Sequence, residues 1–61
     1  MNSKEKKEQI KQNAVFMVGG KLYRIINVEG GNAVVQDTKT GNSMNYGVDA
    51  LSRLNITFYN S

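Results

Sequence analysis

Apolar and polar residues alternate along most of the chain after residue 14, and this period of two is typical of β-strands. Glycine pairs and polar turn residues interrupt the alternation and divide it into short segments. These segments predict strands over residues 15–18, 21–28, 33–37, 43–46 and 55–59. Before residue 14 the pattern differs, because the segment SKEKKEQIKQN is rich in Lys, Glu and Gln and favours a helix over residues 3–13.

The predicted N-terminal helix has a start signal but only a thin apolar face. Asn2 or Ser3 can cap its first amide groups, and Asn2 with Glu5 has the spacing of a capping box. Ile10 and Ala14 alone share an apolar stripe. Because so short a helix is marginal in water, it either packs Ile10 on the body or frays. A solvated arm and a basic arm that touches a partner are both open interpretations.

The longest predicted strand, residues 21–28, carries apolar residues on two faces. Leu22, Ile26 and Val28 share one face with Arg24. Tyr23 and Ile25 occupy the other face. Two apolar faces indicate a strongly bent strand whose halves face different sheets, as in small barrels.

Turn signals connect the strands. Gly30-Gly31 supplies the two positive-φ positions of a tight hairpin, and Gly41 takes the left-handed position of a second hairpin loop. Asp49 can cap one helical turn over residues 50–53, from which Leu51 and Leu54 point inward. In the closing strand, Ile56 and Phe58 alternate into the core.

This order of elements predicts a mainly β fold. We expect a small five-stranded SH3-like barrel preceded by one N-terminal α-helix, with a short helical turn before the last strand. Residues 1–13 form the basic helix or arm, and residues 14–61 form the barrel. Closure of the barrel would remove sheet edges that promote aggregation.

Composition limits the functions open to the chain. With 61 residues it is at most one domain, and its stability is marginal. It contains no Cys and no His, which removes disulfides, thiolate metal sites and the commonest general base. We expect no cofactor. Oligomerisation or an idealised small barrel remains as the source of stability.

Charge and hydropathy give expectations about partners and location. The formal net charge is +3, but the net charge of residues 15–61 is only +1. This is weak electrostatic evidence for nucleic-acid binding. No segment approaches the length of an apolar membrane span, and no signal peptide is recognisable. We expect a cytoplasmic protein with no membrane partner. Frequent Asn, Lys and Ile have A/T-rich codons, which is consistent with a bacterial or phage source.

The candidate chemistry does not indicate an enzyme. Gly19-Gly20-Lys21-Leu22 has neither the earlier glycine nor the Ser or Thr that a phosphate-binding P-loop requires. Asp37 borders a hairpin loop and Asp49 suits a helix cap, so we do not expect a catalytic carboxylate pair. The serines have no His to activate them.

Aromatic and basic residues suggest contact with a partner instead. Tyr23, Tyr46 and Tyr59 can cover the edge of a core or serve as stacking platforms for bases or a partner side chain. Arg24 follows Tyr23 directly, so the two side chains point to opposite faces of their strand. The candidate nucleic-acid-binding residues are Lys21, Arg24, Lys39 and Arg53 for phosphates, and Tyr23 and Tyr46 for stacking.

Residues 21–54 resemble the Tudor/KOW group of SH3-like barrels. The resemblance rests on Tyr23-Arg24-Ile25, Gly30-Gly31, Val35-Gln36-Asp37, Thr40-Gly41 and residues 48–54. It implies binding by contact to RNA, to ribosomal or polymerase surfaces, or to modified side chains. The chain has no Trp, and the aromatic cage of methyl-reading Tudor domains is not recognisable.

The layout is also similar to that of the Sm-like group. An N-terminal helix over residues 3–13 is followed by FMVGGKLYRIINVEGGNAVVQD, and the chain length fits. This resemblance implies a bent five-stranded sheet whose subunits form rings that bind RNA.

From these observations we predict a small non-enzymatic binding module, with a phage as a candidate source. It would regulate a nucleic-acid process by binding RNA, DNA or the machinery on them. A protein–protein adaptor or inhibitor of a host protein is the alternative, and the near-neutral body favours it. A ring-forming Sm-like RNA binder, and hence a homo-oligomer, is the third hypothesis.

Overall fold

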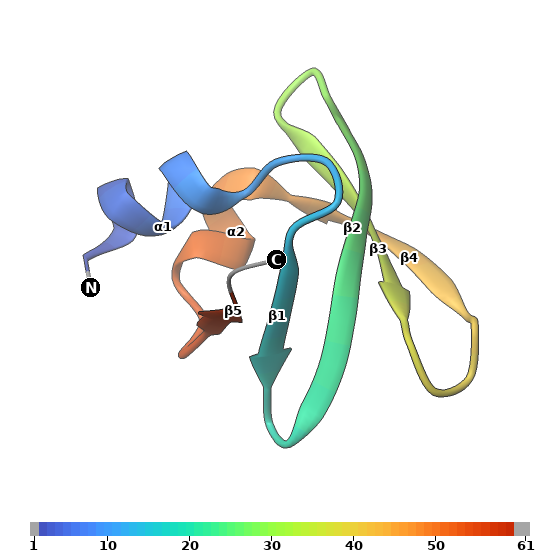
Figure 1. Cartoon of the computed structure of the whole chain (residues 1–61). Helices are drawn as coiled ribbons and strands as arrows, with labels where there is room; N and C mark the ends of the chain where they lie inside the picture. Colours follow the sequence, from blue (N-terminus) through green and yellow to red (C-terminus); the bar gives the residue numbers. More distant parts are fainter. Residues whose placement is uncertain (1, 60–61) are drawn as a thin grey trace.

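The computed structural model describes residues 2–59, which form one antiparallel sheet with two short helices (Figure 1). The strands are β1 (Val15–Val18), β2 (Lys21–Glu29), β3 (Asn32–Asp37), β4 (Ser43–Gly47) and β5 (Thr57–Tyr59). Helix α1 (Ser3–Gln9) precedes the sheet, and α2 (Val48–Ser52) lies between β4 and β5. The predicted mainly β order of helix, four strands, helical turn and strand is confirmed.

The sheet has the strand order β4-β3-β2-β1-β5, so β4 and β5 are its two edges. Within the described residues these edges do not pair with each other, and the sheet is not closed. The closed barrel therefore stays a prediction.

An irregularity in β2 explains its two apolar faces. Ile25 pairs with Val35, but Asn27 pairs with Val34, so Ile26 is an extra residue opposite β3. Such a bulge shifts the alternation of the strand by one residue. Our prediction that Ile26 and Val28 share a face is wrong for this reason: Ile26 is 39% exposed, whereas Val28 packs against the core.

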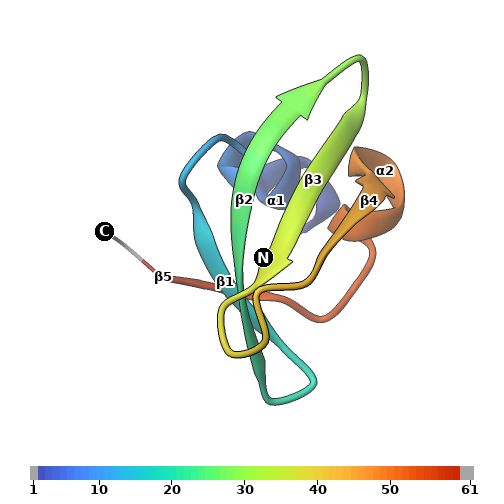
Figure 2. The same cartoon turned by 90° about the vertical axis from the view of Figure 1, so that its right-hand side faces the viewer.

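The core lies on one side of the sheet, which we call the inner face; the opposite side is the outer face. In Figure 2, α1 lies behind β2 and β3. Strands β1, β2 and β3 and helix α2 contribute to the buried cluster, and Phe58 of β5 packs against it. Residues between elements complete it, among them Ile10, directly after α1. Its members are Ile10, Phe16, Ile25, Ala33, Val35, Leu51 and Ile56.

Helix α1 is docked on the body, with Ile10 just beyond its last turn and buried. The side chain of Asn2 accepts a hydrogen bond from the Glu5 backbone amide at 2.9 Å, as the capping prediction required. The helix ends at Gln9 rather than at residue 13, because Ile10 already has extended backbone. Of the two outcomes left open for the arm, packing of Ile10 is confirmed.

Helix α2 begins at Val48, one residue before the predicted cap. Its N-cap is Gly47, which makes no side-chain capping bond, so the prediction of Asp49 as the cap is wrong. Asp49 instead forms a salt bridge with Lys7 of α1 at 2.5 Å. Leu51 is buried as predicted, whereas Leu54 remains 37% exposed.

Two turns lie at the same end of the antiparallel meander, the lower end in Figure 1, and we call residues 18–21 and 38–42 the turn end. The Thr38 amide and hydroxyl both donate to the Leu22 carbonyl, at 3.1 and 3.0 Å, which ties the two turns together. Gly41 has φ of +81°, which confirms its left-handed position. Gly30 and Gly31, with φ of +58° and +79°, form the hairpin turn at the opposite end.

Candidate binding surfaces

The structure divides the six predicted site residues among four places. Tyr23 and Tyr46 line one small cleft on the inner face. Lys21 and Lys39 lie at the turn end. Arg24 is on the outer face, and Arg53 is the C-cap of α2.

The cleft shared by the two tyrosines, which we call the tyrosine cleft, lies between α2 and the inner face. Its lining residues are Phe16, Val18, Tyr23, Val35, Tyr46, Leu51 and Leu54. Its open volume of about 30 Å³ is close to that of a single water molecule. The cleft is therefore too small to enclose a ligand, but a flat group can lie across its mouth.

The side chains of the two tyrosines differ in how far they are exposed. Tyr23 is half-buried, and its ring stacks on Phe16 with centroids 5.4 Å apart and an interplanar angle of 24°. Tyr46 lies on the edge strand β4 and is 37% exposed. Met44, which shares the inner side of β4 with Tyr46, is exposed beside it and was not among the predicted site residues. Tyr23 thus forms the floor of the cleft, and Tyr46 its accessible wall.

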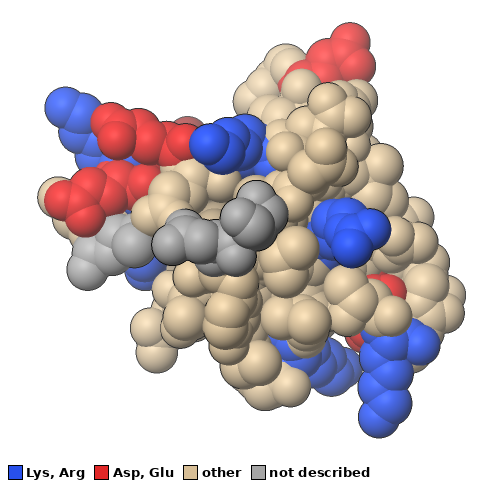
Figure 3. All heavy atoms as spheres, viewed as in Figure 1, with Lys and Arg blue, Asp and Glu red and all other residues tan. Residues whose placement is uncertain are grey.

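Two of the predicted cations lie at the turn end, and one of them, Lys21, shares a face with residues that line the cleft. Lys21 pairs with Val18, so its side chain is on the same inner face as Val18 and Tyr23. Lys39 is exposed in the turn that precedes β4, where its backbone amide donates to the Asp37 carboxylate at 2.8 Å. Within residues 2–59 neither lysine forms a salt bridge. Figure 3 shows basic side chains at the lower end of the molecule with an acidic group next to them, and acidic and basic groups are also mixed over α1.

The other two predicted cations do not join them. Arg24 pairs with Val15 and Gln36 on the outer face, opposite the side that carries Tyr23. Arg53 lies near Asp49, whose pKa is held below its usual value by a hydrogen bond and charge from Lys7 and, to a smaller extent, by the charge of Arg53. The prediction that all four cations act on one ligand is therefore not supported by their positions.

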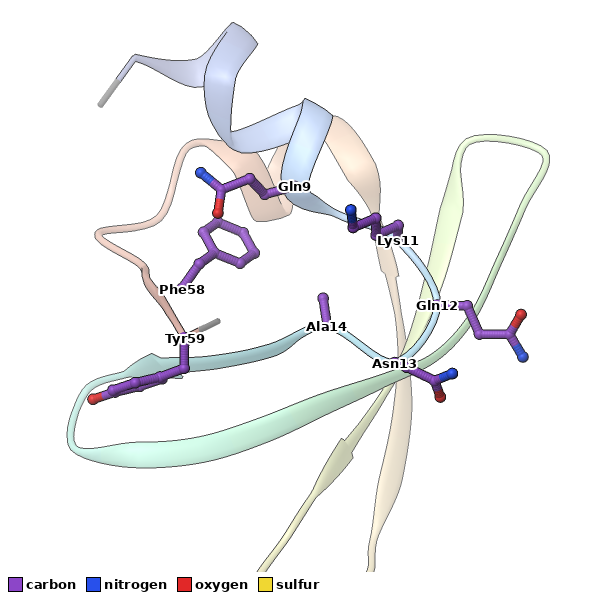
Figure 4. A pocket seen from close by; sticks show the side chains of 7 residues that line it. All are labelled: Gln9, Lys11, Gln12, Asn13, Ala14, Phe58 and Tyr59. Carbon is purple, nitrogen blue, oxygen red and sulfur yellow. The ribbon is translucent and has the colours of Figure 1, made fainter. Parts of the chain in front are cut away.

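A second hollow, of about 480 Å³, lies between the end of α1 and β5. Figure 4 shows Gln9, Ala14 and Phe58 pointing towards this space, while Gln12 and Asn13 project away from it. The hollow is bordered by Tyr59, the last described residue, and open to solvent. Its lining carries no carboxylate, and Lys11 is its only charged residue among those described.

Three further findings concern the chemistry and the relatives of the chain. Among residues 2–59, no three His, Cys, Asp or Glu residues gather as a metal site would require. None of the described helices has the length and apolar character needed to cross a membrane. Comparison with protein-family models, curated proteins and solved structures found no match.

Proposed function

We propose that the protein is a small binding module for single-stranded RNA or DNA, and that it regulates a nucleic-acid process by contact. The observation that carries this proposal is the position of Tyr46. Its ring is exposed at the mouth of a cleft floored by Tyr23, at an edge of the sheet whose nearby turn end carries Lys21 and Lys39.

Stacking supplies the specific part of the proposed contact. A base stacked on an aromatic side chain contributes about 1–3 kcal/mol, and any base has a suitable face. Tyr46 offers such a face, and Leu54 and Met44 extend the apolar surface around it. The Tyr23 ring, which stacks on Phe16, is already ordered before a base binds.

The electrostatic part is small. With two phosphates neutralised by Lys21 and Lys39, the logarithm of the affinity for a single strand should fall with the logarithm of salt concentration with a slope of about −1.4. Raising the salt from about 50 to about 200 mM then weakens binding about sevenfold. This modest dependence agrees with the nearly neutral body of the chain.

Fluorescence anisotropy with a labelled single-stranded RNA of about 10 nucleotides tests this proposal. Tyr46→Ala should weaken binding by about 5- to 150-fold, because it removes one stacked base. Tyr59→Ala is the matched control, since Tyr59 is also an exposed tyrosine but lies on β5, away from the cleft. Equal affinity of the wild type and the Tyr46 variant would refute the proposal.

The topology supports assignment to the SH3-like barrels. The meander order and the helix inserted before the last strand match the predicted layout. A ring-forming Sm-like RNA binder is a second candidate, because β4 and β5 each have one side without a strand partner in the sheet. Such a ring would pair β4 of one copy with β5 of the next. Sedimentation equilibrium distinguishes the two candidates, since only the ring has a mass several times that of the monomer.

A further inference from the structure

No helix of the described residues covers the outer face of the sheet, and apolar side chains lie on it beside polar ones such as Asn27, Gln36 and Asn45. Its residues can be assigned from the strand register, because side chains in register share a face. Five apolar side chains are placed on it by the register: Val15, Met17, Leu22, Val34 and Tyr59. Ile26 has no register partner, but it is exposed and lies two positions after Arg24 on β2, so we assign it to the same face. We call this set the outer patch.

The outer patch is accessible over its whole width. Leu22, Ile26 and Tyr59 are the most exposed members, and Tyr59 reaches 46% exposure. The Tyr59 hydroxyl donates to the Met17 sulfur at 3.7 Å, so these two side chains lie together across β5 and β1. In Figure 2, no described helix lies in front of β2 and β3 on this side.

Arg24 lies within the outer patch. It is flanked along β2 by Leu22 and Ile26, and it faces Val15 on β1 and Gln36 on β3. It is exposed and forms no salt bridge within residues 2–59. Among the outward positions of the five strands, the other charged residue is Glu29, at the far hairpin. Within residues 2–59 the guanidinium therefore has no salt-bridge partner, and its neighbours on the face are apolar except for Gln36.

We propose that the outer patch docks a partner protein that presents a carboxylate within an apolar surface. Arg, Tyr and Met are enriched in the centres of protein interfaces, and the patch contains one of each. Apolar contacts around Arg24 exclude water from it, which strengthens a bidentate bond to a partner Asp or Glu.

The charge on Arg24 also argues against two other occupants. If the outer patches of two copies met face to face, their arginines would bring like charges into an apolar interface, which is unfavourable. A nucleic acid would meet a single cation here, and most of the surface would be apolar, so phosphate contacts would contribute little. A carboxylate-bearing protein surface satisfies both the charge and the apolar area.

Selection from a displayed library of random peptides, with the full chain as bait, tests the proposal. The wild type should enrich peptides in which Asp or Glu lies near aromatic or aliphatic residues. NMR titration with a selected peptide should shift the amide signals of Leu22, Arg24 and Ile26. Peptides without acidic enrichment, or shifts confined to Met44 and Tyr46, would overturn the proposal.

Matched charge reversals complete the test. Arg24→Glu should weaken the selected peptide at least about tenfold, because the change turns an attractive charge pair into a repulsive one. Lys21→Glu makes the same change of charge on the inner face, and it should alter the affinity less than about twofold. The NMR spectrum of each variant verifies that it is folded. Equal effects of the two reversals, or a wild-type dimer in sedimentation that Arg24→Glu leaves intact, would overturn the proposal.

Discussion

On the inner face of the sheet, side chains of β1, β2 and β3 meet the helices, whereas on the outer face side chains of the same strands meet solvent. The contrast is sharpest at two neighbouring isoleucines. Ile25 is fully buried, and Ile26 is 39% exposed. The same residue type thus serves the core at one position and an open surface at the next, because successive side chains of a strand point to opposite faces.

The charged residues divide in a similar way. In the helical layer, Lys6 donates to the Leu54 carbonyl at 2.7 Å and Lys7 pairs with Asp49, so these cations hold α1 against the α2 region. At the turn end, Lys21 and Lys39 form no salt bridge within the described residues. Lys6 and Lys7 therefore hold the helical layer together, whereas Lys21 and Lys39 remain available to bind a partner.

Replacing each isoleucine in turn is the strongest test of this contrast. Ile25→Ala should lower the free energy of unfolding by about 2–5 kcal/mol, because it opens a cavity in the core. A chain of this size has a total stability of only about 3–9 kcal/mol, so the variant is close to unfolding. Ile26→Ala should cost less than about 1 kcal/mol, since this side chain is already exposed. Urea denaturation measures both values, and similar losses would contradict the assignment of the two side chains to opposite faces.

The turn that sets the register between β2 and β3 gives an intermediate effect. Gly31→Ala should destabilise the fold by about 1–2 kcal/mol, because its φ of +79° is unfavourable for a residue with a Cβ atom. Gly47→Ala is the matched control, since Gly47 has φ of −65° and open space around its Cα. It should cost less than about 1 kcal/mol, because its φ suits Ala and only the weaker preference for Gly at the helix N-cap is lost. Thermal unfolding compares the two; a larger loss at Gly47 would show that the described turn geometry is wrong.

The smallest effect is expected from the salt bridge between the helices. Lys7 lowers the pKa of Asp49 in the folded state, so the pair contributes stability above the ordinary pKa of 3.8 and loses it as pH falls through the lowered value. Both side chains are exposed, so the contribution is small. Asp49→Asn should remove this part of the acid dependence in denaturation curves measured between neutral and acidic pH. Lys7→Ala should remove the same part, and strictly additive effects in the double variant would contradict the pairing.

The turns and the order of elements were predictable because they depend on local chemistry. Gly30-Gly31 and Gly41 adopt the positive φ values that their positions in the sequence required. The capping of α1 by Asn2 is equally local. By contrast, the bulge at Ile26 depends on the pairing with β3, and alternation along β2 alone misassigned the face of Val28.

Contacts between elements distant in sequence were the hardest to predict. Asp is a residue type that often caps helices, but Asp49 does not cap α2. It forms a salt bridge with Lys7, which is far away in the chain. Tyr23 and Tyr46 were both proposed as platforms, yet the ring of Tyr23 stacks on Phe16 and only Tyr46 is left exposed. Of the four proposed cations, Arg24 could have been separated from the others in advance, because its strand parity already placed it opposite Tyr23.

The most direct test is an NMR titration of isotopically labelled protein with single-stranded RNA at low and moderate salt. It shows whether nucleic acid binds the inner face and leaves the outer face free. The account predicts shifts at Lys21, Lys39 and Tyr46 that weaken as salt rises, with the signals of Leu22 and Ile26 unchanged. Shifts centred on the outer face, or no shifts even at low salt, would contradict it.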